Sequence, residues 1–164
     1  MLPTELPKWH RVYYYFRLWR NDGTWQRLHD NLCAKVRQQA GRQKQPNAEC
    51  LNSQSIKTTA IAGVRGFDGA KQIKGRKRHL LIDTLGFLLV VVVTAASLPE
   101  RDGARLLFAR LTGSCKKLRR IWVDGGYRGP FVQWVAERFR FVVEVVLRRD
   151  EAKAFVLLPL LESH

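Results

Sequence analysis

The chain has 164 residues, 46% of them hydrophobic, and 29 Lys and Arg against 14 Asp and Glu give a net charge of +15. This length supports one globular core with a small additional unit, and the charge favours a polyanion such as nucleic acid over a merely solvated basic surface. The sequence shows no signal peptide, no bilayer-spanning run and no zinc or disulfide pattern, which predicts a cytoplasmic protein without a membrane partner.

The first 40 residues have the apolar spacing of two helices. Apolar side chains recur every three or four positions in residues 10–20 and again in residues 25–39. Asn21-Asp22-Gly23 separates the two segments, and Thr24 is predicted to cap the second helix. A helix pair joined by a short glycine turn is compatible with a helix-turn-helix, although this pattern is weakly specific. Residues 41–48 are polar and contain Gly and Pro, which indicates a linker.

After the linker, the pattern predicts strands that alternate with helices. Residues 57–78, basic and rich in glycine, are expected to form a loop. The order β, ββ hairpin, α, β, α, β predicts an α/β fold with a mixed sheet and flanking helices. The strands are expected at 49–56, 79–83, 87–96, 118–124 and 141–147, and the helices at 101–111 and 130–139.

The run IWVDGGYRG places Asp124 at the end of an apolar strand and on a glycine turn. Functional groups gather at strand ends because a rigid scaffold presents them there. Metal-assisted phosphoryl transfer uses several carboxylates that hold two divalent ions about 4 Å apart, and Asp124 suits that role. The alternative is a structural aspartate that caps the Gly125-Gly126 turn.

Several runs of this sequence resemble bacterial insertion-sequence transposases of the DDE class, IS-five type. The resemblance extends from about Trp9 to Pro159. It implies a ribonuclease-H-like fold, cleavage and strand transfer of DNA, Mg²⁺ or Mn²⁺ as the cofactor, and element ends and target DNA as partners. The runs are RVYYYFRLWRNDGTWQRLHD, LNSQSIKTT, GFDGAKQIKGRKRHLLIDTLGFLLVVVV, ERDGARLL and IWVDGGYRG.

Position by position, the resemblance implies one intact catalytic acid. Asp124 falls on the second aspartate of the family, which makes it the expected catalytic and metal-binding residue. The first aspartate belongs in a D-S-Q-S-x-K-T strand, where this chain has Asn52. The third acid, a glutamate on a helix after FVLLP, would fall just beyond His164. Further helices precede the first segment in the family, so we expect a form truncated at both ends.

The resemblance also implies a division into domains. Residues 1–40 correspond to a remnant of the helical DNA-binding region, and residues 41–48 to the linker. Residues 49–164 correspond to an incomplete ribonuclease-H-like catalytic domain. With one acid of three, we expect weak metal binding and impaired catalysis, because Mg²⁺ is usually held through carboxylates.

Other acids and histidines are assigned structural roles. Asp83 is expected to serve the hairpin turn, which we favour over a role as a substitute catalytic acid. Asp68, Asp102 and Asp150 are expected to cap and solubilise loops or a helix start. Three of the four histidines show no metal-ligand spacing and are assigned to packing or to the surface; they are His10, His29 and His79.

A cluster of basic residues predicts the surface that binds DNA. One acid, Asp68, stands among them between residues 57 and 79. A phosphate backbone across this cluster would give a salt-dependent, sequence-tolerant affinity, and a solvated charge run is the competing interpretation. The residues are Lys57, Arg65, Lys71, Lys74, Arg76, Lys77, Arg78 and Arg128.

Three interpretations follow from these patterns. The first is an insertion-sequence transposase in a truncated, catalytically impaired form, which acts as a homo-oligomer or in association with an intact transposase. The second is a non-catalytic DNA-binding remnant that regulates an intact relative. The third is a chain that does not fold stably, because an incomplete sheet exposes apolar strands to water.

Overall fold

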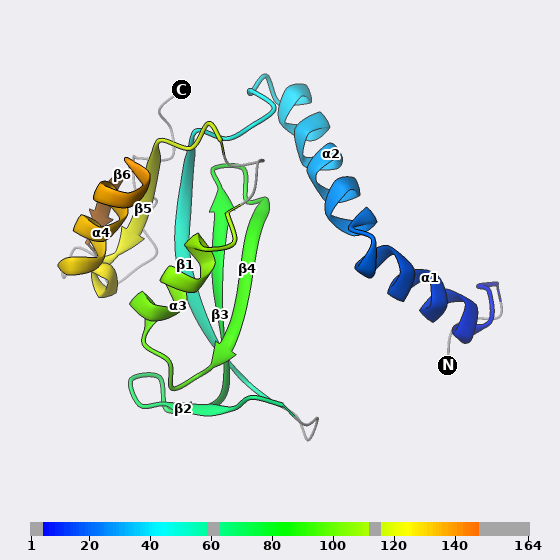
Figure 1. Cartoon of the computed structure of the whole chain (residues 1–164), viewed down its shortest axis with the longest axis horizontal. Coiled ribbons are helices and arrows are strands. Elements are labelled where there is room, and N and C mark those ends of the chain that lie inside the picture. Colours follow the sequence, from blue (N-terminus) through cyan, green and yellow to red (C-terminus); the bar gives the residue numbers. More distant parts are fainter. Residues whose placement is uncertain (1–4, 59–62, 112–115, 148–164) are drawn as a thin grey trace, which may run out of the picture. The chain divides into compact units, whose positions relative to one another are not determined.

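The computed structural model describes residues 5–58, 63–111 and 116–147 (Figure 1). The chain divides into two compact units, residues 1–44 and residues 45–164. The roles expected for Asp150 and for the segment FVLLP lie outside the described residues. No helix in the described part of the chain combines the length and apolar character needed to span a bilayer.

The first unit contains the two predicted helices, α1 (Trp9–Asn21) and α2 (Thr24–Gln39). The prediction that Thr24 caps α2 is wrong, because Thr24 is the first helical residue and Gly23 occupies the cap position with φ of +75°. Asp22 accepts a hydrogen bond from the Thr24 amide at 2.9 Å, which satisfies one of the amides at the start of the helix. Both helices are confirmed, whereas a DNA-binding helix-turn-helix stays a prediction.

The second unit is built on a mixed six-stranded sheet. Its strand order is β2-β3-β1-β5-β6, and β4 pairs with β3. The pairs β1–β5 and β5–β6 are parallel, whereas β1–β3, β2–β3 and β3–β4 are antiparallel. This confirms the predicted mixed α/β fold. The strands are β1 (Ala48–Lys57), β2 (Gly66–Asp68), β3 (Ile73–Asp83), β4 (Leu88–Ala95), β5 (Arg120–Asp124) and β6 (Val142–Val146).

The prediction that residues 57–78 form a loop is wrong in part. Within the described part of this segment, ten residues are strand, namely the last residue of β1, all of β2 and the first six residues of β3. Burial alternates from residue to residue along β3. Lys74 is exposed and Arg76 half-buried, whereas Gly75 and Lys77 are buried. This alternation is the period of a strand, but charged residues occupy both of its faces, so the sequence shows no apolar period.

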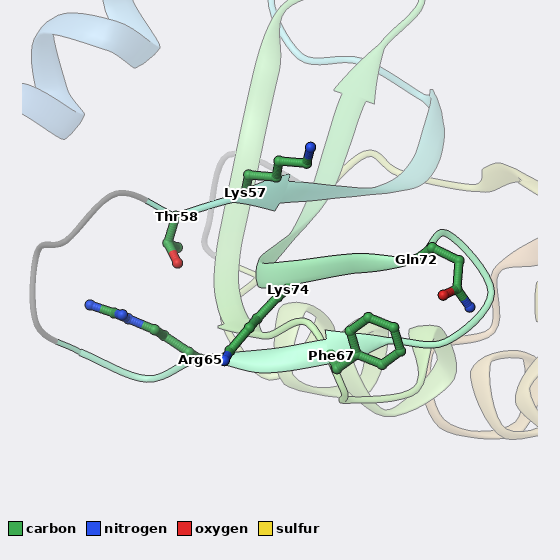
Figure 2. Close-up of a pocket in the computed structure, with 6 residues that line it drawn as sticks. All are labelled: Lys57, Thr58, Arg65, Phe67, Gln72 and Lys74. Carbon is green, nitrogen blue, oxygen red and sulfur yellow. The ribbon is translucent and has the colours of Figure 1, made fainter.

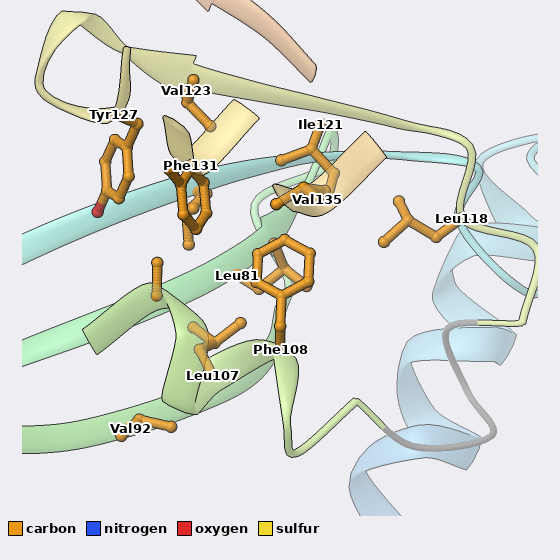
Figure 3. Close-up of a cluster of buried hydrophobic side chains, with 12 residues drawn as sticks. Leu81, Val92, Leu107, Phe108, Leu118, Ile121, Val123, Tyr127, Phe131 and Val135 are labelled. Carbon is orange, nitrogen blue, oxygen red and sulfur yellow. The ribbon is translucent and has the colours of Figure 1, made fainter. Parts of the chain in front are cut away.

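Helices α3 (Glu100–Phe108) and α4 (Pro130–Phe139) contribute to one core with the sheet, and both helices were predicted. Leu81 of β3 and Ile121 of β5 point into this core from the sheet. Phe108 packs edge-to-face on Phe131, with ring centroids 5.9 Å apart (Figure 3). The buried apolar residues are Leu51, Leu81, Val92, Ala104, Leu107, Phe108, Leu118, Ile121, Val123, Tyr127, Phe131 and Val135.

The hairpin between β3 and β4 depends on Asp83. Its buried side chain accepts hydrogen bonds from the Leu85 amide at 2.9 Å and the Phe87 amide at 2.8 Å. Gly86 adopts φ of +86°, a left-handed conformation that glycine reaches without strain. Asp83 therefore has the structural role predicted for it.

His79 is a packing residue, which is one of the two roles that the sequence left open for it. Its ring is fully buried, and Nε2 lies 3.1 Å from the hydroxyl oxygen of Thr94. A side chain at Gly103 of α3 would collide with the ring, so helix and strand approach closely here. Burial lowers the pKa of His79, which favours the neutral imidazole.

Candidate functional site

Alternation along β1 and β3 divides the polar residues of the sheet between two faces. The face toward the core carries Ser53 and Ser55, which are buried, and the opposite face carries Asn52 and Gln54, which are exposed. On β3, Lys77 and His79 share the core face because they pair with Ser55 and Ser53. Arg76 and Arg78 therefore lie on the same face as Asn52.

Asn52 and Asp124 lie on neighbouring parallel strands. The ladder between β1 and β5 pairs Ala48 with Arg120 and ends with Cys50 and Trp122. The ladder stops there, so Asn52 and Asp124 each lie two residues beyond the last residues that it pairs, and both side chains are exposed. We call the end of β5 at Asp124, together with the turn that follows it, the Asp124 corner.

Asp124 also caps the turn that follows it. Its Oδ1 accepts a hydrogen bond from the Gly126 amide at 2.9 Å, at the start of the short 3₁₀ turn Gly125–Tyr127. The capping interpretation of Asp124 is therefore confirmed. The second carboxylate oxygen has no hydrogen bond among those described here, so capping leaves room for a further role.

A second carboxylate, Glu100, lies beside the same turn. A Cβ atom added to Gly126 would lie 2.8 Å from a Glu100 carboxylate oxygen and 3.1 Å from Asp124 Oδ1. The other Glu100 oxygen accepts from the Ser53 hydroxyl at 2.5 Å and from Lys71 Nζ at 3.1 Å. Burial raises the pKa of Glu100, but these two donors outweigh it and lower the pKa, so the carboxylate stays ionised.

The first turn of α3 joins the Asp124 turn to the rest of the sheet. Arg101 Nε donates to the Gly126 carbonyl oxygen at 2.9 Å, next to the Glu100 contacts. Tyr127 is fully buried, and burial, with the nearby Glu100 and Asp124 carboxylates, raises the pKa of its hydroxyl. Sequence reasoning missed Glu100 and Arg101. Both lie in ERDGARLL, one of the runs that resemble the transposases, but its residue pattern indicates only the start of an amphipathic helix.

The donors at this corner do not fit a pair of divalent ions. Among residues 5–58, 63–111 and 116–147, no group of three or more His, Cys, Asp or Glu side chains comes together in a metal-binding arrangement. Asn52 offers an uncharged amide oxygen, and this oxygen already accepts from the Ser53 amide at 2.7 Å. Glu100 is neutralised by Lys71. Mg²⁺ prefers carboxylates that are available to it, so Asp124 alone is a poor site.

The structure removes Lys77 from the predicted DNA-binding cluster. Its ammonium lies 3.2 Å from Asp68 Oδ2 and donates to the Leu98 carbonyl oxygen at 3.1 Å, and both partners of the ion pair are about 6% exposed. Of the two roles expected for Asp68, capping is confirmed and solubilising a loop is wrong. Asp68 ends β2 and is buried; its Oδ1 accepts from the Ala70 and Lys71 amides at 3.1 Å, and its Oδ2 accepts from the Ser55 hydroxyl at 2.5 Å. Asp102 lies in the first turn of α3, as predicted.

Lys71 forms an ion pair with Glu100. Three of the remaining predicted cations lie along β3, on the face of the sheet opposite the core. Lys74 is exposed, and Arg76 and Arg78 are half-buried. Arg76 Nε donates to the Val64 carbonyl oxygen at 3.1 Å, and Arg78 Nη2 donates to the Gln54 side chain at 2.6 Å. These bonds fix the guanidinium groups on the same face as Asn52.

The other three predicted cations lie at the ends of elements. Lys57 is the last residue of β1, Arg65 immediately precedes β2, and both are exposed. Arg128 follows the Asp124 turn, is exposed, and its backbone amide donates to the Gly125 carbonyl oxygen at 3.3 Å. Basic side chains thus lie on the face of the sheet opposite the core and near the turn that contains Asp124.

One comparison with known proteins gives a match. A family model described as a transposase DDE domain matches residues 50–158, which is more than half of the chain. The matched span includes Asn52, Asp124 and all eight predicted DNA-binding residues. Searches of curated proteins and of solved structures gave no match.

Proposed function

Because the chain belongs to the family of transposase DDE domains, we propose that it binds DNA as a transposase does but has an impaired catalytic centre. The family implies a nuclease and strand-transferase that uses a divalent metal and acts on DNA. The motifs GFDGAKQIKGRKRHLLID and WVDGGYRG support an IS-five-type insertion-sequence transposase with a ribonuclease-H-like fold.

The observation that carries this proposal is the placement of Lys74, Arg76 and Arg78. These side chains lie on the face of the sheet that also presents Asn52. A row of cations on this face suits a phosphate backbone laid across β3 and β1. Phosphate contacts position DNA without reading its sequence, so the affinity of this surface should be sequence-tolerant.

The impaired centre is inferred from Asn52. An amide at this position lacks the negative charge and the second oxygen ligand of an aspartate, and its oxygen is engaged by the Ser53 amide. Residues that act as a unit in catalysis are strongly non-additive, so loss of one member removes nearly all of the rate. We therefore expect DNA binding to survive while cleavage does not.

A cleavage assay tests the impaired centre. Supercoiled DNA is incubated with Mg²⁺ or Mn²⁺ and with the chain, its Asp124→Ala variant or its Asn52→Asp variant. We expect the first two proteins to be equally inactive. Metal-dependent nicking by the unchanged chain that disappears in Asp124→Ala would contradict the proposal. If only the Asn52→Asp variant nicks DNA, the amide at position 52 is the cause of the lost cleavage activity.

A binding assay tests the DNA surface. The triple variant Lys74→Ala, Arg76→Ala, Arg78→Ala should lose affinity for duplex DNA, and the slope of log K against log salt should fall by about 1 for each lost phosphate contact. A charge-matched triple variant, Arg105→Ala, Arg110→Ala, Arg138→Ala, changes exposed cations in or next to the helices of the core face. Equal losses in the two variants would show that net charge, not this surface, binds DNA. Circular dichroism checks that both variants fold.

A further inference from the structure

A pocket with a volume of about 480 Å³ lies where β1 ends beside the β2–β3 hairpin. Its size falls in the range of roughly 300–1,000 Å³ that is typical of sites for small organic ligands. Figure 2 shows the side chains around it, which come from the end of β1, from β2 and its approach, and from the turn and start of β3. They are Lys57, Thr58, Arg65, Phe67, Gln72 and Lys74.

Phe67 is the aromatic member of this pocket. Its side chain is 52% exposed on β2, and it pairs across the ladder with Lys74. A single exposed apolar side chain is common and needs no explanation by itself. Here the surroundings are unusual, because three of the six lining residues are basic and none is acidic.

Asp68, the residue after Phe67, does not neutralise the positive charge of the pocket. Asp68 follows Phe67 directly, and successive side chains of a strand point to opposite faces. Its carboxylate is buried among Ser55 and Lys77, on the side of the sheet toward the core. The Ser55 hydrogen bond first, and the Lys77 ammonium after it, lower the pKa of Asp68 to about 2, so its charge is held by partners away from the pocket.

We propose that this pocket binds an unpaired nucleobase of single-stranded DNA, which stacks on Phe67 while Arg65 and Lys74 contact the adjacent phosphates. The inference rests on the proposed DNA-binding function and adds a ligand to it. Proteins bind single strands by combining a cationic groove with aromatic side chains, since every base has a face that can stack. No base-specific contact is required, so the preference is for the strandedness of the DNA and not for its sequence.

The pocket and the row of cations on β3 then recognise different features of DNA. In a duplex, the faces of the bases are covered by their neighbours, and only phosphates and groove edges reach a protein. Phe67 gains little from such a ligand, whereas Lys74 and Arg76 gain from either form. The contribution of Phe67 should therefore appear in single-strand affinity alone, which separates this inference from general electrostatic attraction.

Binding of labelled oligothymidine and of a duplex of equal length tests the inference. Phe67→Ala should weaken single-strand binding by roughly 5- to 140-fold, as expected for one stacked base at ~1–3 kcal/mol and 1.4 kcal/mol per tenfold change. Duplex affinity should stay unchanged. Phe67→Trp should retain single-strand affinity, and Phe67→Leu should lose most of it, because leucine keeps the apolar surface without the ring. Val64→Ala, which removes a neighbouring side chain that is 70% exposed, is the matched control.

Direct contact is tested with bromodeoxyuridine at one position of the oligonucleotide. Irradiation should cross-link the base to residue 67, and mass spectrometry of the digested protein locates the link. A cross-link elsewhere, together with unchanged binding in Phe67→Ala, would overturn the inference. An equal loss for duplex and single strand, or a stronger Phe67-dependent affinity for oligouridine RNA, would also overturn it.

The two proposals fail in different ways. If the chain binds neither form of DNA, the proposed function fails and the inference fails with it. If the chain binds duplex DNA through Lys74, Arg76 and Arg78 but Phe67→Ala changes nothing, the inference fails alone. Thermal melts of each Phe67 variant show whether a loss of binding reflects unfolding, and the exposed position of Phe67 predicts little change in stability.

Discussion

Lys74 and Lys77 lie three residues apart on β3, yet they have opposite environments. Lys77 is buried in an ion pair with Asp68 on the core face, whereas Lys74 is exposed on the other face. β1 shows the same contrast between its two faces: the buried Ser53 donates a hydrogen bond to Glu100, whereas Asn52 is exposed to solvent. The side of a strand, and not the density of charge along the sequence, therefore decides which residues support the fold and which can meet a ligand.

Substitution of Lys77 should produce the largest difference between the two faces. Lys77→Met leaves the buried Asp68 carboxylate without its cation, which costs roughly 3–5 kcal/mol of unfolding free energy. Lys74→Ala should change stability by less than about 0.5 kcal/mol while it lowers DNA affinity. Urea denaturation measures the stabilities. A stable Lys77→Met variant with weakened DNA binding would reverse the assignment of these two residues.

A double variant keeps this test informative if Lys77→Met does not fold. Lys77→Met combined with Asp68→Asn removes both charges of the pair, so no unpaired buried ion remains. We expect the double variant to be more stable than Lys77→Met alone, since a neutralised pair often costs little. Equal instability of the two variants would show that packing of the lysine stem, and not its charge, stabilises this site.

Two glycines give a comparison of intermediate size. A Cβ at Gly103 would collide with the buried His79 ring, whereas a Cβ at Gly69 meets no atom within 4 Å. Gly103→Ala should destabilise the chain by about 1–3 kcal/mol through overpacking of the core face. Gly69→Ala should be close to neutral. Thermal melts of both variants check the difference, and equal melting temperatures would mean that α3 can shift away from β3 without cost.

The smallest predicted effect is a change in pH dependence. The pKa of Asp68 is lowered to about 2 in the folded chain, first by the Ser55 hydroxyl, from an ordinary value of 3.8. Because the folded pKa is the lower one, the stabilisation is present above pH 4 and is lost as the pH falls through about 2. Ser55→Ala should reduce this loss, because the Asp68 pKa then rises toward its unfolded value.

The change is measured as the urea midpoint of the unchanged chain and of Ser55→Ala between pH 2 and pH 6. The two curves should lie farthest apart near neutral pH and converge at the acid end. Asp102→Asn is the control, because Asp102 is an exposed partner of Arg105 in an i,i+3 pair. Parallel curves for the unchanged chain and Ser55→Ala would show that the Ser55 hydrogen bond does not lower the pKa of Asp68.

Much of the fold was predictable because its elements have local signals. Asp83 before a short glycine turn indicated the hairpin, and the apolar run before Asp124 indicated β5. The extent of β3 was not predictable in this way. Its first half carries Lys, Arg and Gly on both faces, so nothing in the sequence shows that Lys77 is buried until Asp68 is placed against it.

The candidate site was predictable only in part. The resemblance singled out Asn52 and Asp124, which lie on adjacent parallel strands, each two residues beyond the last residues paired between them. Glu100 was missed because its contacts are non-local: its partners Ser53 and Lys71 lie 47 and 29 residues earlier in the chain. No local sequence pattern indicates such a contact. The pocket around Phe67 was missed for another reason, because Phe67 and its basic neighbours lie in a segment that was predicted to be a loop.

The long-range contacts of Glu100 bear on the order in which the chain folds. Closing a loop costs entropy before its contacts repay it, so non-local pairings tend to form after local ones. The β3–β4 hairpin joins residues that are close in sequence, whereas the carboxylate of Glu100 gathers a strand, a turn and a helix start from distant segments. The corner that contains Asp124 therefore depends on a nearly complete sheet, and a partly folded chain would present its hairpin well before it presented this corner.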